Sequence, residues 1–377
     1  MVYYDFKGIQ LSSLGMGCMR FPVKNENNAE IDEEKVAEMV AYAIGKGINY
    51  FDTAWGYHSG CSEIVIGKVL SAYPRESFYL ASKFPGYDLA NLEKKEEIFE
   101  KQLEKCRVDY FDFYLFHNVS EKNVDGYLDE KYGIYDYLIE QKKKGKIRHL
   151  GFSTHGNLDT MKRFLDAYGK DMEFCQLQIN WLDWGFQNAK AKCELVAKYG
   201  IPIWVMEPVR GGKLVTLDEK HESALKELNG NRTLAEWAFR FIQSLDNIGV
   251  TLSGMSNFTQ LKENVATFEK EEKLTNNELR TLFRIAREMT SANTVPCTAC
   301  SYCTEKCPMQ LDIPWLLELY NEHVYTGGGF IAPMAESALP ESKRPASCIG
   351  CRSCEAVCPQ EIKISEALAD FAKRLAE

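Results

Sequence analysis

Two runs of cysteines near the end of the chain constrain its fold more than any other feature. Each run has the spacing Cys-x2-Cys-x2-Cys-x3-Cys-Pro, and the second run repeats the first. The eight residues are Cys297, Cys300, Cys303, Cys307, Cys348, Cys351, Cys354 and Cys358. Thiolates at this spacing bind four-iron, four-sulfur clusters. The sequence therefore predicts two 4Fe-4S clusters and a fold that brings the two runs together.

The two runs resemble those of bacterial two-cluster ferredoxins, in which the fourth cysteine of each run binds the other cluster. On that pattern, one cluster takes Cys297, Cys300, Cys303 and Cys358, and the other takes Cys348, Cys351, Cys354 and Cys307. Zinc and disulfides are the alternatives. Zinc takes four ligands in paired Cys-x2-Cys units, which does not explain three short spacings plus a proline, twice over. Disulfides belong to oxidising compartments, and nothing else in the chain has the character of a secreted protein.

Composition excludes several classes of protein. The 377-residue chain has a formal charge of −9, whereas nucleic-acid binding favours a basic face. No apolar run approaches the roughly 18 residues of a membrane span, and the first residues form neither a basic nor an apolar signal segment. The remaining cysteines are scattered and are interpreted as reduced thiols. We therefore expect a cytoplasmic protein with no nucleic-acid partner and no membrane partner.

Strand-like apolar runs alternate with amphipathic stretches before the cysteine runs. The predicted strands are 14–18, 50–52, 78–82, 111–116, 149–153, 174–179, 202–206 and 248–253. A period of about 3.6 residues predicts helices at 31–45, 92–106, 133–144, 158–168, 187–199 and 234–244. Eight alternating units predict a closed (β/α)8 TIM barrel. A doubly wound open sheet is the alternative, but no Gly-x-Gly-x-x-Gly follows the first strand.

The chain is expected to contain two domains. A short hairpin at 3–11 precedes the barrel, and a helix at 275–289 follows it. The predicted boundaries are 1–290 for the α/β barrel and 291–377 for a C-terminal, mainly helical, ferredoxin-like iron–sulfur domain. Helices at 313–324 and 365–375 are predicted within this second domain.

Polar residues stand at or just beyond the C-terminal ends of three neighbouring predicted strands, the face that carries the active site in barrel enzymes. They are Asp52, Lys83 and His117, with Tyr57 on the loop after Asp52. A lysine ammonium lowers the pKa of a nearby tyrosine, and Asp52 would pair with Lys83. Tyr57 would then donate a proton to a carbonyl oxygen that His117 orients, while hydride arrives at carbon. Each residue alone is more often structural, and the set of four favours catalysis.

At these residues the chain resembles the aldo-keto reductase family. The stretch Phe51-Asp52-Thr53-Ala54-Trp55-Gly56-Tyr57, followed by Ser62-Glu63 and Gly67, is similar to the family's second-strand signature, and Lys83 and His117 complete its tetrad. The similarity runs from about residue 11 to residue 268, and the whole chain resembles the ferredoxin-fused branch of the family. The resemblance implies an oxidoreductase that interconverts a carbonyl and an alcohol by hydride transfer with NADPH or NADH.

The resemblance also implies which residues bind the nicotinamide cofactor. They are Gly17, Cys18, Met19, Asp52, Ser153, Gln176, Met206, Pro208, Gly254, Gln260, Glu263 and Asn264. Ser153 and Gln176 match the pair that holds the carboxamide. Met206 replaces the aromatic residue that stacks on the ring, and Gln260 replaces an arginine that commonly grips the 2′-phosphate. These departures leave the choice between NADP and NAD open.

A hydride carries two electrons, whereas each cluster accepts one. A flavin is therefore a further candidate cofactor, because it can exchange two electrons with a nicotinamide and single electrons with the clusters. The clusters could also exchange electrons with an electron-carrier protein, or serve structure alone. Two function classes therefore remain. The complete tetrad favours a reductase of a small-molecule carbonyl, whose substrate the sequence does not specify. The clusters and the altered nucleotide loop favour an electron-transfer or redox-sensing protein with little carbonyl reductase turnover.

Overall fold

A computed structural model of the chain describes residues 1–291 and 294–377. Within these residues the chain divides into two compact units. The barrel unit contains Met1–Val119 and Asn123–Thr281, and the cysteine unit contains Ser120–Lys122 and Leu282–Glu377. Among the described helices, none has the length and apolar content needed to cross a membrane.

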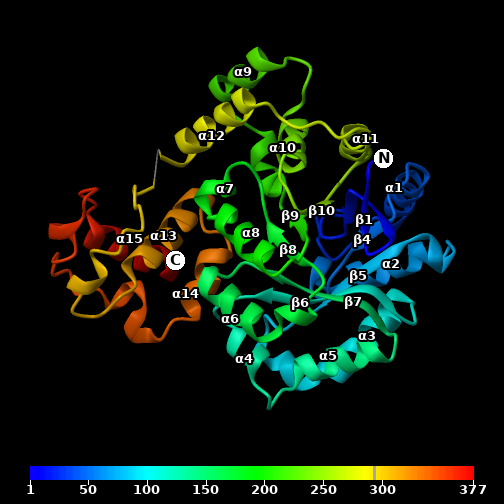
Figure 1. Ribbon diagram of the computed structural model, residues 1–377, viewed down its shortest axis with the longest axis horizontal. Helices are drawn as coiled ribbons and strands as arrows, with labels where there is room; N and C mark the ends of the chain where they lie inside the picture. The colour runs from blue at the N-terminus through cyan, green and yellow to red at the C-terminus, as the bar shows by residue number, and fades with distance from the viewer. Residues whose placement is uncertain (292–293) are drawn as a thin grey trace. The chain divides into compact units, whose positions relative to one another are not determined.

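The barrel unit has the predicted α/β fold. In the described chain, eight parallel strands close into a barrel in the order β10-β3-β4-β5-β6-β7-β8-β9 (Figure 1). Their bounds are β3 Leu14–Gly17, β4 Tyr50–Asp52, β5 Tyr79–Phe84, β6 Phe111–Val119, β7 Ile147–Thr154, β8 Cys175–Gln178, β9 Ile203–Met206 and β10 Ile248–Ser253. Each overlaps a predicted strand. Because all eight are parallel, their C-terminal ends meet at one mouth of the barrel.

An antiparallel hairpin closes the opposite end of the barrel. It consists of β1 (Tyr3–Phe6) and β2 (Ile9–Ser12). Phe6 and Leu11 from this hairpin join a buried cluster with Tyr50, Phe113 and Trp204 from the barrel strands. The rings of Phe6 and Trp204 meet edge to face at 5.2 Å. This aromatic packing seals the N-terminal end of the strands and leaves the C-terminal mouth for chemistry.

The helices of the barrel unit lie around the strands in Figure 1. They are α1 Glu33–Gly45, α2 Ser62–Leu70, α3 Lys95–Cys106, α4 Val124–Leu128, α5 Ile134–Lys143, α6 Leu158–Tyr168, α7 Asp183–Phe186, α8 Ala189–Lys198, α9 Glu219–Leu228, α10 Leu234–Gln243 and α11 Phe258–Thr267. All six helices predicted between the strands are present. Several begin at a capping side chain, as α1 does where Asp32 accepts a hydrogen bond from the Lys35 amide.

Some helices have no predicted counterpart. The α2 helix buries most of its residues, including Val65, Ile66, Val69 and Leu70. Consecutive apolar residues of this kind give no clear helical period, because almost every face of the helix is covered. The α9 helix lies between β9 and α10 and lengthens the connection that follows β9.

The cysteine unit is mainly helical, as expected. After α12 (Asn276–Ser291), which begins in the barrel unit, it contains α13 (Ile313–Thr326), α14 (Ile331–Ser337) and α15 (Ile364–Ala376). Its buried core includes Leu316 and Leu317 of α13, Leu368 of α15, and the cysteines Cys303 and Cys354. The side chains of Cys303 and Cys354 thus form part of the apolar core of this unit.

Candidate functional site

Lys83 is the centre of a closed polar network at the mouth of the barrel. It lies on β5, its side chain is 0% exposed, and its ammonium is 2.5 Å from Asp52 Oδ1. The same nitrogen donates to the carbonyl oxygen of Thr53 at 2.8 Å and to the Tyr57 hydroxyl at 3.4 Å. An ammonium has three N–H donors, and each has an acceptor here. Gln176 donates to the second Asp52 oxygen at 3.2 Å and thereby orients the carboxylate.

Burial decides the protonation of Tyr57. It raises the pKa of this phenol, and the Lys83 ammonium lowers the pKa without cancelling that rise. The lowering of the pKa by Lys83 that the sequence predicts is present, but the larger effect of burial sets the net direction. Burial alone would lower the pKa of Lys83, but Asp52 and Tyr57 beside it raise that pKa above its ordinary value. At neutral pH the site therefore holds a protonated phenol against a charged ammonium.

His117 stands beside Tyr57 as a neutral ring. Burial, assisted by the positive charge of Lys83, holds the pKa of His117 well below its usual range. The rings of Tyr57 and Tyr87 face it edge-on, with centroids 6.0 and 5.1 Å away. Among the described residues, His117 Nδ1 has no hydrogen-bond partner. A neutral imidazole has one N–H donor and one acceptor, so this ring can hydrogen-bond a ligand.

A second buried network supports the strand that carries Lys83. The Glu63 carboxylate is 0% exposed and accepts hydrogen bonds from Ser82 and Gln102, each at 2.7 Å. Lys105 neutralises Glu63 at 2.7 Å. Gln102 also donates to the carbonyl oxygen of Lys83 at 3.0 Å. These contacts hold the Ser82 side chain and the Lys83 carbonyl oxygen in place, and they give Glu63 a structural role beside the site.

The loop that carries Tyr57 is fixed by the next residue. His58 is buried and has a positive φ of 51°, a conformation that costs energy for a residue with a side chain. Its Nε2 accepts a hydrogen bond from the Phe21 amide at 3.0 Å, and its Nδ1 lies 2.9 Å from the Asn28 carbonyl oxygen. The ring also stacks on Phe21. His58 therefore ties the Tyr57 loop to the segment that follows β3.

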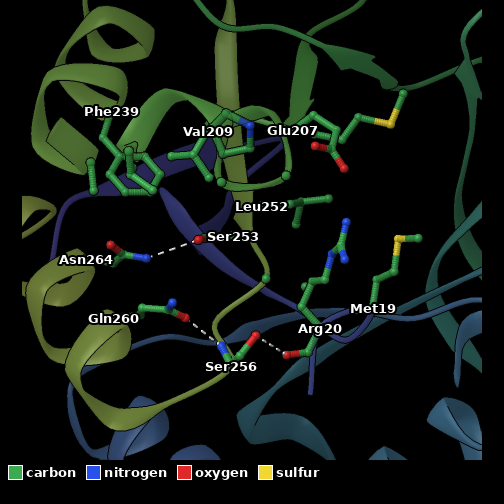
Figure 2. Close-up of a pocket in the computed structure, with 18 of the residues that line it drawn as sticks. Met19, Arg20, Glu207, Val209, Phe239, Leu252, Ser253, Ser256, Gln260 and Asn264 are labelled. Atoms are coloured by element: carbon green, nitrogen blue, oxygen red, sulfur yellow. Dashed lines mark hydrogen bonds between the residues drawn. The ribbon is translucent and has the colours of Figure 1, made fainter. Parts of the chain in front are cut away.

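A cavity of about 340 Å³ opens beside this network (Figure 2). Asp52 and Tyr57 line one part of it. Most of the residues assigned to the cofactor by resemblance also line it, namely Gly17, Met19, Asp52, Gln176, Met206, Pro208, Gly254, Gln260, Glu263 and Asn264. The structure thus brings together residues from five strands or the loops that follow them, and from α11.

Two of the assigned residues do not line the cavity. Cys18 is fully buried, and its thiol lies 3.7 Å from the carbonyl oxygen of Met16. Ser153 is also buried, and its hydroxyl accepts a hydrogen bond from the Asn118 amide at 2.8 Å. The Ser153 hydroxyl keeps a proton that it can donate, because it acts only as acceptor in that bond.

The far end of the cavity is built from the loop after β10 and from α11. The Gln260 side-chain oxygen accepts a hydrogen bond from the Ser256 amide at 2.8 Å, and Asn264 donates to the Ser253 hydroxyl at 3.0 Å. Figure 2 shows both pairs, with Phe239 close by. These bonds hold the loop in a single shape and leave Glu263 exposed at its edge.

The sequence argument missed several residues that line the cavity, above all Arg20 and Glu207. Arg20 lies three residues beyond the end of β3, and Glu207 directly follows β9. Their positions just past strand ends are the same signal that identified Asp52 and His117. A systematic reading of every charged residue in that position would have found both.

The cysteines gather in two sets of four. One small cavity is lined by Cys297, Cys300, Cys303 and Cys358, and a second by Cys307, Cys348, Cys351 and Cys354. Each set combines three cysteines of one run with the last cysteine of the other. The walls are apolar, with Leu317 and Ile362 at the first and Leu311 and Leu368 at the second.

The backbone around the two sets repeats. Ser301 and Arg352 occupy matching places in the two runs and both have positive φ, at 65° and 59°. Gln310 and Glu361, which follow the runs, also match at 52° and 53°. The Leu311 amide donates to the Cys307 sulfur at 3.4 Å. Apolar walls, grouped thiols and amide donors to sulfur are features that suit an iron–sulfur cluster.

Comparison with known proteins identifies both parts of the chain. Residues 13–287 match the model of the aldo/keto reductase family. The chain belongs to this family. Residues 296–364 match a 4Fe-4S dicluster domain. The barrel site is therefore that of an aldo/keto reductase-type oxidoreductase, and the cysteine unit is an iron–sulfur domain.

Curated relatives of this aldo/keto reductase cover only part of it. A probable aldo-keto reductase from Glycine max is 29% identical over 232 residues, which are 58% of this chain and 63% of the relative. An NADH-specific methylglyoxal reductase from Escherichia coli is 26% identical over 227 residues, which are 55% of this chain and 66% of the relative. The matches thus span slightly less than two thirds of these two relatives.

Solved structures of the family share the barrel. The holo form of aldo-keto reductase AKR11C1 from Bacillus halodurans superimposes with a TM-score of 0.61 at 25% identity, covering 76% of this chain and 96% of that one. An aldo/keto reductase from Klebsiella pneumoniae in complex with NADP and acetate gives a TM-score of 0.59 at 18% identity, covering 74% and 93%. The second likeness shows the fold alone.

Proposed function

We propose that this protein reduces a small-molecule carbonyl to an alcohol, or the reverse, with NADPH or NADH. The observation that carries the proposal is the cluster of Asp52, Lys83, Tyr57 and His117, of which Asp52 and Tyr57 line the cavity. A nicotinamide, when bound, supplies or accepts the hydride. The chain's own residues then have to position the carbonyl and manage one proton.

Tyr57 is the proposed proton donor. Its phenol is protonated at neutral pH because burial raises its pKa. Lys83, held by Asp52, stabilises the phenolate that remains after the proton leaves, since the ammonium already contacts that oxygen. His117 hydrogen-bonds the carbonyl oxygen from a neutral ring, which avoids a second cation beside Lys83. In the oxidative direction the same phenol oxygen takes the proton back.

The cavity suits the nicotinamide dinucleotide in its chemistry. Gly17, Met19, Gln176, Met206 and Pro208 lie at the end near Asp52, where we assign the nicotinamide. Gly254, Gln260, Glu263 and Asn264 lie toward α11, where we assign the adenosine. Ser153 and Cys18 do not line the cavity. We assign Ser153 a hydrogen bond to the nicotinamide carboxamide, because its hydroxyl proton is not used in the bond with the Asn118 amide. The choice between NADP and NAD is left to measurement.

The cysteine unit is proposed to hold two 4Fe-4S clusters, one in each set of four thiols. We assign residues 1–290 to the barrel domain and 291–377 to the iron–sulfur domain. The grouping of three cysteines from one run with the fourth of the other supports this ligand assignment. We also propose a cytoplasmic location, because a reducing compartment keeps cysteine thiols available to bind metal.

A second candidate function is electron transfer or redox sensing with little carbonyl turnover. It is favoured by Cys300 and Cys351, one in each set, which are exposed to solvent and therefore within reach of an electron-carrier partner. A flavin in the barrel mouth would join two-electron and one-electron steps in this candidate.

One experiment separates the two candidates. Protein purified without oxygen is incubated with NADPH or NADH and a panel of aldehydes, and both nucleotide oxidation and alcohol formation are followed. The reductase proposal predicts alcohol formation equal to nucleotide oxidation. Nucleotide oxidation that reduces the clusters but forms no alcohol from any aldehyde would favour the second candidate.

A further inference from the structure

The backbone of Arg20 is held between the two ends of the cavity. On one side, the Arg20 carbonyl oxygen accepts a hydrogen bond from the Ser256 hydroxyl at 2.9 Å. On the other side, the next residue, Phe21, donates its amide to His58 in the Tyr57 loop at 3.0 Å. The backbone at Arg20 and Phe21 is therefore hydrogen-bonded both to the loop that carries Tyr57 and to the loop before α11.

The Arg20 side chain crosses the cavity, and glycines make room for it. An ideal Cβ on Gly254 would lie 2.7 Å from Arg20 Cγ, closer than two carbon atoms allow. An ideal Cβ on Gly211 would lie 3.6 Å from an Arg20 guanidinium nitrogen. The guanidinium thus passes over the end of β10 and reaches the loop after β9. Figure 2 shows it rising from the side of Ser256 toward Glu207.

Glu207 lies at the point that the guanidinium reaches. An ideal Cβ on Gly211 would be 3.8 Å from Glu207 Oε2, as well as 3.6 Å from the Arg20 nitrogen. Both groups line the cavity, and among the residues that the structure describes the Arg20 guanidinium forms no ion pair. A cation and a carboxylate therefore face each other across a gap, without a direct salt bridge.

We propose that Arg20 binds the pyrophosphate of the nicotinamide dinucleotide and that Glu207 competes with this pyrophosphate for Arg20. The inference rests on the proposed function, because it takes the dinucleotide as the ligand of the cavity. Guanidinium pairs with phosphate oxygens through two parallel hydrogen bonds, a geometry that a lysine does not reproduce. A carboxylate at the same guanidinium makes the binding of a second anion weaker.

The location selects the pyrophosphate rather than the 2′-phosphate. Arg20 lies between the catalytic end, marked by Asp52 and Tyr57, and the α11 end, marked by Gln260 and Asn264. In an extended dinucleotide, the pyrophosphate joins the nicotinamide half to the adenosine half. The 2′-phosphate is on the adenosine half, and the side chain at that end is Gln260, which carries no charge.

The test is a comparison of dissociation constants for NADH, NADPH and inorganic pyrophosphate, measured on the full-length, cluster-loaded protein. The variants are Arg20→Gln, Arg20→Lys, Glu207→Gln and the double variant Arg20→Gln/Glu207→Gln. Lys24→Gln is the matched control, because it removes a positive charge from the same segment at an exposed position outside the cavity lining. Melting curves establish that each variant is folded.

We expect Arg20→Gln to raise the dissociation constants of NADH and NADPH by the same factor. This factor should be roughly 10- to 100-fold, the scale of a lost charge-assisted hydrogen bond. Arg20→Lys should recover part of the loss, and Lys24→Gln should change nothing. Glu207→Gln should lower both dissociation constants by about 3- to 10-fold. This gain in affinity should largely vanish in the double variant, because Glu207 acts through Arg20.

Each other outcome overturns part or all of the account. Unchanged nucleotide affinity in Arg20→Gln would show that Arg20 does not bind the nucleotide. A loss of affinity for NADPH alone would show that Arg20 binds the 2′-phosphate instead. Unchanged nucleotide affinity in Glu207→Gln would show that Glu207 does not compete with the pyrophosphate for Arg20. If the wild type binds inorganic pyrophosphate in an Arg20-dependent way but no dinucleotide, the anion site stands and the proposed function fails. Binding of neither ligand ends both.

Discussion

The two functional regions of the molecule are built on opposite principles. In the barrel, Lys83 is fully buried and each of its N–H groups has a protein acceptor, so the hydrogen bonds of this ammonium are satisfied by protein atoms alone. In the cysteine unit, the sulfurs of Cys303 and Cys354 belong to the apolar core and have cavities beside them. The first region is organised before any ligand binds, and the second is organised around its ligand.

The two regions obtain their stability from different sources. The core of the barrel is built from side chains of the hairpin and of the barrel strands, such as Phe6, Phe113 and Trp204. The cysteine unit is small, and part of its core consists of thiols that metal would join. Metal binding is then folding free energy for this unit, and loss of metal should affect it without affecting the barrel.

The largest effect is expected from Tyr57→Phe, which removes the phenolic proton and retains the ring. Carbonyl reduction should fall by roughly 100- to 10,000-fold, the scale of general acid catalysis, whereas nucleotide binding and cluster content should be unchanged. Turnover and the dissociation constant for NADPH are the measurements. Tyr110→Phe, directly before β6 and outside the cavity lining, is the control. Near wild-type turnover in Tyr57→Phe would show that the barrel network is not the catalytic centre.

In the cysteine unit, Cys303→Ser should remove one cluster. The iron content of anaerobically prepared protein should fall from about eight atoms to about four, and the cysteine unit should lose protection against hydrogen exchange while the barrel strands keep theirs. Cys193→Ser, which alters a barrel cysteine outside both sets, should change neither quantity. Equal loss of protection in the barrel and in the cysteine unit would contradict the contrast. Stoichiometric zinc without iron would end the cluster assignment.

In the barrel, Asp52→Asn should lower the free energy of unfolding by about 3–5 kcal/mol, because it leaves the buried Lys83 ammonium without its counter-charge. Denaturant unfolding of the barrel, followed by tryptophan fluorescence, is the measurement. Lys68→Ala breaks the pair with Glu33, which is exposed on both sides, and should cost less than about 1 kcal/mol. A similar cost for the two variants would show that the Lys83 network is solvated rather than preorganised.

The smallest effect is expected from the pH dependence of the barrel. The pKa of His117 is lowered in the folded state by burial, so the unfolded chain takes up a proton below about pH 6.5 while the folded chain does not. The stability that the neutral ring contributes is therefore present above that pH and declines as the pH falls toward the folded pKa, by at most about 1.4 kcal/mol per pH unit. His117→Gln should flatten the decline in unfolding free energy between about pH 6.5 and pH 5. An identical slope in the variant would show that His117 titrates normally.

Much of the fold follows from local pattern. Apolar runs such as 111–116 and 248–253 identified β6 and β10 because a barrel strand is buried along its whole length. The position just past a strand end was enough to group Asp52, Lys83 and His117. The spacing of the cysteines predicted the two sets of four, because a short loop fixes which sulfurs can converge.

The remainder depends on contacts between distant parts of the sequence. The rise in the pKa of Tyr57 comes from burial, which no local pattern reports. The role of Arg20 could not be predicted, because it depends on Gly254 and Glu207, which lie more than a hundred residues away along the chain. The α2 helix was missed because its apolar residues face almost every direction.

The central proposal is that the barrel site transfers a hydride to carbon and a proton from Tyr57 to oxygen. Its most direct test uses NADPH or NADH that carries deuterium at the transferable position, with an aldehyde substrate and the anaerobic, cluster-loaded protein. Mass spectrometry of the alcohol then locates the label. The account predicts one deuterium on the carbinol carbon for each nucleotide oxidised. Alcohol that forms without deuterium, or label lost to water while the clusters become reduced, would contradict it.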